Sequence, residues 1–111
     1  MEFDNNKPIF VQIGDTICER ILSGELKSED RIPSVRELGG ELGVNPNTVA
    51  RTYEKLTDAG IIYNKRGIGY FICPDAARIV LEKEREVFLN EDAPKFFKRM
   101  QLLGIDSKEL L

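Results

Sequence analysis

The stretch VNPNTVARTYEKL, residues 44–56, decides the fold, because it places a proline between two asparagines at the head of a helical pattern. The side chain of Asn45 can accept a hydrogen bond from the backbone N–H of Asn47 or Thr48, which is the role of an N-cap residue. Pro46 suits the first helical position, where its missing N–H is not needed. The sequence therefore predicts a helix that begins at residue 46.

This predicted helix has two different sides, because successive residues turn by about 100° around its axis. The packing side holds Val49, Thr52, Tyr53, Leu56 and Ala59. The outward side holds Asn47, Thr48, Arg51 and Lys55. One side can pack in a core, while the other presents hydrogen-bond donors at its leading turns. For Tyr53 the core role is preferred.

A shorter helix is predicted immediately before it. Ser34 and Glu37 have the S-x-x-E spacing of a capping box, ahead of an apolar pattern over residues 35–42. Gly43 suits the left-handed residue that closes such a helix. Two short helices joined by a turn of about three residues form a helix-turn-helix. An ordinary helical hairpin within a core is the alternative.

The residues before this pair predict a first helix. Residues 8–23, PIFVQIGDTICERILS, repeat apolar side chains at the i, i+4 spacing of an amphipathic helix, and Gly24 is placed to end it. Leu26 and Ile32 then bracket a polar connection and are expected to pack under the core.

A hairpin is predicted after the helix-turn-helix. IIYNK, residues 61–65, and YFIC, residues 70–73, read as strands around the glycine-containing turn RGIG, residues 66–69. A hairpin in this position is the wing of a winged helix. The G-x-G sequence suggests a phosphate-binding loop as another interpretation, but such a loop needs a helix after the glycines, and neither a third glycine nor a Lys-Ser/Thr pair directly follows residues 67–69.

Length and composition indicate one ordinary globular domain. A chain of 111 residues with 41% hydrophobic residues can bury a real core. No apolar run approaches the roughly 18 residues of a membrane span, and the N-terminal MEFDNNKP lacks the features of a signal peptide. We therefore expect a cytoplasmic protein with no membrane insertion.

The net charge of −3 conceals an uneven distribution of charge along the chain. Residues 1–30 carry three Lys/Arg and seven Asp/Glu, residues 31–73 carry six and four, and residues 74–111 carry seven and eight. Only the middle segment is positive, which suits nucleic-acid contact but fits an ordinary solvated surface equally well.

The chain lacks the residues of most catalytic and metal sites. It contains no histidine, and its two cysteines, Cys18 and Cys73, stand apart among apolar residues. These facts argue against histidine-based catalysis and against a zinc site. The cysteines are predicted to be small core thiols. We expect neither enzymatic activity nor a cofactor.

Residues 8–71 together resemble the winged-helix DNA-binding domain of GntR-type bacterial transcription regulators. The resemblance rests on PIFVQI, ILSGEL, IPSVRELGGELGVNPNTVARTYEKL and AGIIYNKRGIGYF at their distances along the chain. The chain departs from the family pattern at Gly39 and Gly40, where an Ala-containing helix is usual. It also departs at residues 28–30, which lack the glycine often found before the I/L-P-S sequence. Each glycine inside the helix costs about 1 kcal/mol relative to alanine.

The resemblance implies DNA contacts for residues on the two helices and the wing, namely Ser34, Arg36, Asn45, Asn47, Thr48, Arg51, Lys55, Lys65, Arg66 and Gly67. Arg36 can pair bidentately with a guanine or clamp a phosphate. Asn47 and Thr48 are placed for base edges and phosphates, and their backbone N–H groups are predicted to form an anion site. The wing residues are expected at the DNA backbone or minor groove. Ser34 is expected to act first as a helix cap.

Residues 75–111 predict two amphipathic helices, the second beginning at Asp92 or Ala93. Their apolar stripes are interpreted as a dimer interface formed by Ile79, Val80, Val87, Phe88, Phe96, Phe97, Met100 and Leu103. Such a short tail resembles the YtrA-like subgroup, in which two helices dimerise and no metabolite-binding domain follows. A fragment of a longer regulator, such as one with an aminotransferase-like domain, is the other interpretation.

The sequence thus predicts an α+β, mainly α, protein: a winged helix-turn-helix domain over residues 1–74 and a two-helix dimerisation tail over 75–111. The predicted function is a homodimeric, sequence-specific transcription regulator, a repressor that binds an inverted-repeat operator in double-stranded DNA. A winged-helix module for protein–protein contacts without a DNA target is the alternative. Whether a small-molecule effector also binds, between the tail helices and the winged domain, stays open.

Overall fold

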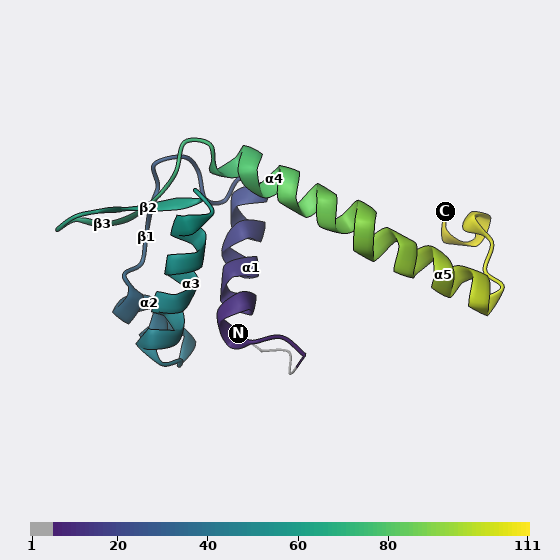
Figure 1. Cartoon of the computed structure of the whole chain (residues 1–111), viewed down its shortest axis with the longest axis horizontal. Coiled ribbons are helices and arrows are strands. Elements are labelled where there is room, and N and C mark those ends of the chain that lie inside the picture. The colour runs from purple at the N-terminus through teal and green to yellow at the C-terminus, as the bar shows by residue number, and fades with distance from the viewer. Residues whose placement is uncertain (1–5) are drawn as a thin grey trace. The chain divides into compact units, whose positions relative to one another are not determined.

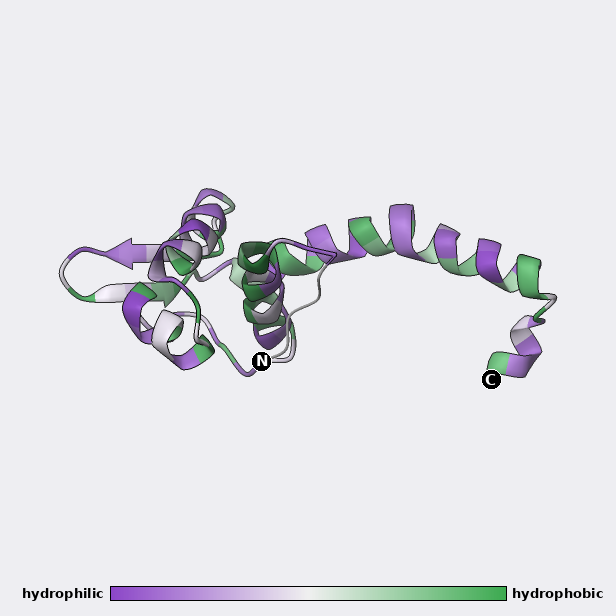
Figure 2. Cartoon of the chain, turned by 90° about the horizontal axis from the view of Figure 1, so that it is seen from below, coloured by the Kyte–Doolittle hydropathy of each residue, from purple (hydrophilic) through white to green (hydrophobic). Residues whose placement is uncertain are grey.

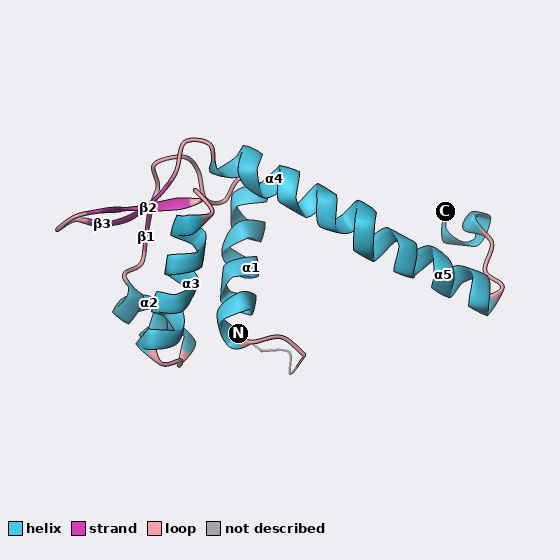
Figure 3. Ribbon diagram, viewed as in Figure 1, coloured by secondary structure: helices cyan, strands magenta, loops and turns pink. Residues whose placement is uncertain are grey.

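The computed structural model describes residues 6–111, so residues 1–5 of the predicted winged-helix domain lie outside the described part. Residues 6–111 are mainly helical with a small antiparallel sheet, as predicted (Figure 3). In chain order the elements are α1 (Ile9–Leu22), β1 (Arg31–Ile32), α2 (Val35–Leu42), α3 (Pro46–Asp58), β2 (Ile62–Lys65), β3 (Gly69–Ile72), α4 (Ala76–Val87), the π-helical turn η1 (Phe88–Asp92), α5 (Ala93–Leu103) and the 3₁₀ turn η2 (Ser107–Leu110).

The chain divides into two compact units, Met1–Val80 and Leu81–Leu111. The first, the winged-helix unit, contains the hydrophobic core, and α1 and α2 both pack against α3 there (Figure 1). Its fully buried side chains are Tyr53, Ile13, Ile62, Ile72, Val49, Val80 and Thr52. Cys18 and Cys73 pack half-buried against this core, which agrees with the prediction of core thiols.

The helix α1 follows the predicted pattern. It begins after Pro8 and buries Ile13, Ile17 and Ile21. Gln12 is also buried, which the pattern did not predict, and its Nε2 donates a hydrogen bond to the backbone oxygen of Lys7 at 2.8 Å. The buried side-chain amide of Gln12 therefore has a hydrogen-bond partner at the edge of the core.

The caps of α2 and α3 are those predicted from local sequence. The Ser34 hydroxyl accepts from the N–H of Glu37, and the Glu37 carboxylate accepts from the N–H of Ser34, both at 3.1 Å. Gly43 ends α2 in the left-handed conformation at φ 68°. Asn45 caps α3 and Pro46 is its first residue. Ala59, predicted on the packing side, is instead an exposed C-cap residue, because α3 ends before it.

The sheet has the strand order β1-β3-β2, with both pairs antiparallel. The hairpin of β2 and β3 was predicted, whereas β1 was not. In β1, Arg31 pairs with Phe71 and Ile32 with Tyr70. Two residues that pair with a segment about forty positions away leave no local periodicity, so only the tertiary fold identifies this strand. Leu26 and Ile32 are buried, as expected.

The tail contains both predicted helices, but η1 joins α4 to α5 in place of a loop. In η1 the N–H of Ala93 donates to the oxygen of Phe88, an i→i+5 bond. Pro94 has no N–H, and its ring crowds the carbonyl of the residue four positions earlier in an α-helix. A π turn is one way for a helix to take up such a disruption without ending. Among residues 6–111, no helix combines the length and the apolar character needed to cross a membrane.

Candidate nucleic-acid interface

An open depression of about 780 Å³ lies over the turn between α2 and α3. It is lined by Val35, Arg36, Gly39, Gly40, Gly43, Val44, Asn45, Pro46 and Asn47. Three of the predicted DNA contacts, Arg36, Asn45 and Asn47, thus share one surface. Lys55 lies in the last turn of α3, and the structure does not bring it to this depression.

The close approach of α2 to this turn depends on Gly39. A Cβ at residue 39 would lie 3.0 Å from the backbone oxygen of Val44 and 3.4 Å from Cα of Pro46. At Gly40 a Cβ would meet nothing within 4 Å. The first glycine of the pair therefore permits the packing of the helix-turn-helix, while the second is simply exposed.

Arg36 is the exposed cation of this surface. Its guanidinium makes no ion pair with any residue of the described range 6–111, and the backbone N–H groups of Val35 and Arg36 have no acceptor there. The start of α2 therefore offers a planar guanidinium and two first-turn N–H groups on the same side. Such a combination can bind an anionic oxygen or the edge of a guanine.

The neighbouring Ser34 acts as a cap, as expected. Its backbone N–H, then its hydroxyl, then the charge of Arg31 hold the pKa of the Glu37 carboxyl below its ordinary value. Glu37 is therefore ionised at neutral pH, and its negative charge lies at the positive end of the α2 dipole. The capping box thereby fixes the backbone from which Arg36 projects.

The first turn of α3 differs from the prediction in one respect. The N–H of Asn47 donates to Oδ1 of Asn45 at 2.8 Å, and the N–H of Thr48 donates to the oxygen of Asn45 at 2.9 Å. Both groups are thus occupied within the chain, so the predicted anion site at these N–H groups is not available. The exposed Asn47 side chain remains free of hydrogen bonds to the described residues.

Arg51 is exposed, but its guanidinium lies over the ring of Phe10, 4.0 Å from the ring centroid. The next residue, Thr52, donates its hydroxyl hydrogen to the oxygen of Phe10 at 2.7 Å. These two contacts hold α3 against the start of α1. Phe10 was not among the predicted site residues, because nothing local connects it to a residue 41 positions later.

The wing presents Lys65, Arg66 and Gly67 at its tip, all of them exposed. Gly67 has φ 78°, a value that favours glycine. Nζ of Lys65 lies 5.6 Å from the centroid of Phe71, so this cation leans along the sheet. Arg66 makes no ion pair within residues 6–111.

Tyr53 has the predicted core role. It is completely buried, its hydroxyl donates to the oxygen of Pro33 at 2.6 Å, and its ring meets Tyr70 edge-on with centroids 4.8 Å apart. Burial, more than the nearby charge of Glu41, raises the pKa of Tyr53 well above its ordinary value. The phenol is therefore a neutral structural group that joins α3 to the segment before α2.

The residues predicted for dimerisation differ in their exposure. Val80 is 1% exposed in the core of the winged-helix unit, and Ile79 packs against that core. Val80 is covered by its own chain, which corrects its assignment to an interface, whereas Ile79 is only partly buried and stays a prediction. Val87 and Met100 are half-buried. The remaining four, Phe88, Phe96, Phe97 and Leu103, are 53–60% exposed.

Comparison with known proteins identifies the family. The family model "Bacterial regulatory proteins, gntR family" matches residues 10–72. The uncharacterized HTH-type transcriptional regulator YhcF of Bacillus subtilis (strain 168) is 37% identical over 110 residues, 99% of this chain and 89% of YhcF. The HTH-type transcriptional repressor YtrA of the same organism is 40% identical over 78 residues, 70% of this chain and 60% of YtrA.

A solved structure agrees with these sequence matches. The GntR family transcriptional regulator from Listeria monocytogenes superposes with a TM-score of 0.79 and 35% identity, covering 97% of this chain and 93% of that one. These relatives are named as transcriptional regulators or repressors, and a regulator family agrees with the expectation of a non-enzymatic protein. The chain therefore belongs to the GntR family of bacterial DNA-binding transcription regulators.

Proposed function

We propose that this chain is a homodimeric repressor that binds an inverted-repeat operator, with the first turns of α3 in the major groove. The observation that carries the proposal is the open depression at the α2–α3 turn, which both Arg36 and Asn47 line with side-chain donors that no described residue uses. Arg36 reads a guanine or clamps a phosphate, and Asn47 reads a base edge. Asn45 and Ser34 serve mainly as caps that fix these two residues.

The wing adds a second contact. Lys65 and Arg66 approach the phosphate backbone or the minor groove, and Gly67 lets the turn come close because it has no side chain. Thr48 and Arg51 lie farther around α3, where they meet phosphates at the groove edge. Lys55, near the end of α3, contributes to the attraction of DNA more than to sequence recognition.

The dimer is formed by the tail. Phe88, Phe96, Phe97 and Leu103 are more than half exposed, so residues 81–111 present large apolar side chains that their own chain does not cover. A second copy covers this surface, and a two-fold pair of winged-helix units matches two inverted half-sites. Repression is proposed because YtrA, a similar protein, is named as a transcriptional repressor.

The experiment starts with selection of bound fragments from a random DNA pool, followed by affinity measurements on the selected operator over a range of salt concentrations. We expect a palindromic sequence and an affinity that falls steeply with the logarithm of salt concentration. Arg36→Ala should weaken binding by about 1 to 3 kcal/mol and relax the sequence preference at one position of each half-site.

The matched control is Arg78→Ala, which also removes one positive charge. Arg78 lies in the first turn of α4 and pairs with Asp75, outside the proposed interface. This variant should bind nearly as tightly as the unaltered protein. A flat salt response, or equal binding by the Arg36 and Arg78 variants, would contradict the proposal.

A further inference from the structure

Four of the exposed apolar residues of the tail have an unusual spacing. Leu81, Phe88, Phe96 and Leu103 are 49–58% exposed, and they follow one another at intervals of seven, eight and seven residues. Seven residues make about two turns of an α-helix, so the outer intervals keep their side chains in line. Eight residues turn a regular α-helix by about 80° too far. An uninterrupted α-helix would therefore split these four residues into two separate pairs.

The π turn removes this mismatch. The interval of eight, from Phe88 to Phe96, contains η1, in which Ala93 bonds to Phe88 across five residues. A π turn accommodates one residue more than an α turn. The extra residue is thus absorbed, and this geometry predicts that the four side chains lie on one continuous stripe. Figure 2 shows hydrophobic and hydrophilic residues alternating along this helical run.

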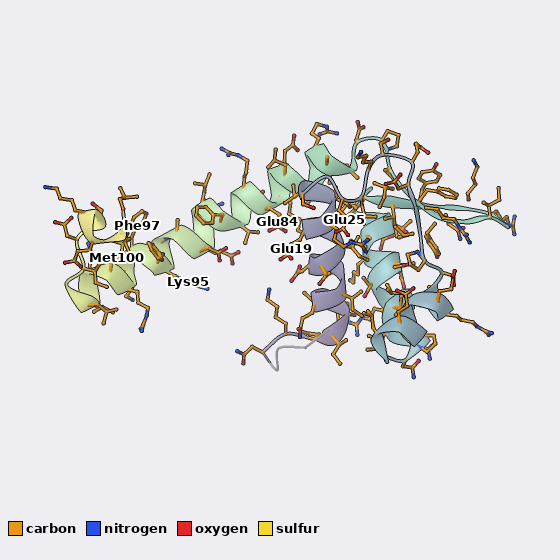
Figure 4. The ribbon with its side chains drawn as sticks, turned by 180° about the vertical axis from the view of Figure 1, so that it is seen from behind. Glu19, Glu25, Glu84, Lys95, Phe97 and Met100 are labelled. Carbon is orange, nitrogen blue, oxygen red and sulfur yellow. The ribbon has the colours of Figure 1, made fainter. Side chains whose placement is uncertain are left out.

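Charge divides the same helical run at the π turn. Residues 81–92 carry five Asp/Glu and two Lys/Arg, a net charge of −3. Residues 93–103 carry three Lys/Arg and no acidic residue, a net charge of +3. Figure 4 labels Glu84 in the first half, and Lys95 in the second half close to Phe97 and Met100. The helical run therefore has an acidic half and a basic half whose net charges are equal and opposite.

We propose that this stripe pairs with the same stripe of a second copy in the antiparallel direction, with the two-fold axis near the π turn. The proposal rests on the homodimer proposed above and adds its geometry. Antiparallel pairing places the acidic half of each copy against the basic half of the other, whereas parallel pairing opposes like charges along the whole length. A two-fold axis also makes the contact self-complementary, with one patch meeting itself.

Spin-label distances in the full chain test the direction. Single cysteines replace Lys83 or Asn90 in a Cys18→Ala, Cys73→Ala background, and each is labelled with a nitroxide. For the antiparallel pair, labels at 83 should lie roughly 30 Å apart, whereas labels at 90 should lie on the order of 10 Å apart. Short distances at both positions would overturn the antiparallel arrangement while supporting a dimer. No dipolar coupling at either position would overturn the homodimer itself.

A pair of length variants tests the role of the π turn. Both variants carry Pro94→Ala, which restores the N–H that a regular α-helix needs and removes the clash of the proline ring. In this background, deleting Asn90 leaves intervals of seven throughout, so a regular α-helix keeps the stripe and dimerisation should persist. Inserting one alanine after Asn90 makes the middle interval nine, and the dimer dissociation constant should rise at least tenfold. Equal dissociation constants for the two variants, measured by sedimentation at several concentrations, would overturn the role given to the π turn.

Discussion

The winged-helix unit and the tail unit use similar apolar residues in opposite ways. Every buried core residue among residues 6–111 lies at or before Val80, whereas no residue from 81 to 111 is buried. Both regions contain amphipathic helices, and α3 and α5 each carry an apolar stripe. The difference shows that helical periodicity identifies the apolar face of a helix. It does not reveal whether the same chain covers that face.

The starts of α2 and α3 also differ from the start of α5. Side chains cap α2 and α3, and the caps hold the first turns that form the candidate interface. By contrast, no side-chain cap bond is found at the start of α5, which continues from the π turn. The proposed DNA contacts need fixed positions, whereas in the proposed dimer the second copy orders the tail helix.

The largest expected effect comes from two neighbouring residues at the boundary of the units. Val80→Asp places a carboxylate where the side chain is 1% exposed, whereas Leu81→Asp places it where the side chain is 49% exposed. The first change should destabilise the winged-helix unit by about 3 kcal/mol or more, a large part of a typical stability of roughly 5–15 kcal/mol. The second should change folding by no more than about 0.5 kcal/mol.

Thermal unfolding by circular dichroism at low protein concentration measures the difference, and sedimentation measures the dimer. Leu81→Asp should weaken dimerisation, because Leu81 belongs to the proposed stripe. If both variants unfold at the same temperature, the boundary between the two kinds of packing is not at residue 80.

Local chemistry made much of the winged-helix unit predictable. The cap at Asn45, the capping box at Ser34 and the left-handed Gly43 each act within a few residues, so their effects can be read from short stretches. Family membership then favours the DNA-binding function over the protein-interaction module. The individual DNA contacts, the homodimer and the small-molecule effector are predictions from the sequence.

Features that depend on distant residues were not predictable. β1 exists through its pairing with β3, and Arg51 is placed by Phe10, far earlier in the chain. At residue 29, in the segment without the expected glycine, Glu29 itself adopts φ 70° and accepts a hydrogen bond from Tyr63. A non-glycine residue can hold this conformation when surrounding contacts fix it, and those contacts come from another element.

A smaller difference in stability is expected between alanine substitutions at the two adjacent glycines of α2, one closely packed and one exposed. Gly40→Ala should stabilise the fold by about 1 kcal/mol, because alanine favours the helix and the new Cβ meets nothing. Gly39→Ala should give no net stabilisation, because its Cβ would press on the backbone oxygen of Val44 and offset the gain in helix propensity. Urea unfolding of both variants gives the comparison. A Gly39→Ala protein as stable as Gly40→Ala would mean that the α2–α3 turn can relax.

The smallest expected effect is a pH dependence confined to the winged-helix unit. The N–H and hydroxyl of Ser34 lower the pKa of Glu37 in the folded state, so its carboxylate stabilises the fold at neutral pH. This contribution is complete above the unfolded pKa of about 4.3 and is lost as the pH falls through the lower folded pKa. The unfolding temperatures of Glu37→Gln and the unaltered protein should therefore differ at pH 7, and the difference should shrink as the pH falls below the unfolded pKa. A constant difference across this range would show that the charge of Glu37 does not support the cap from which Arg36 projects.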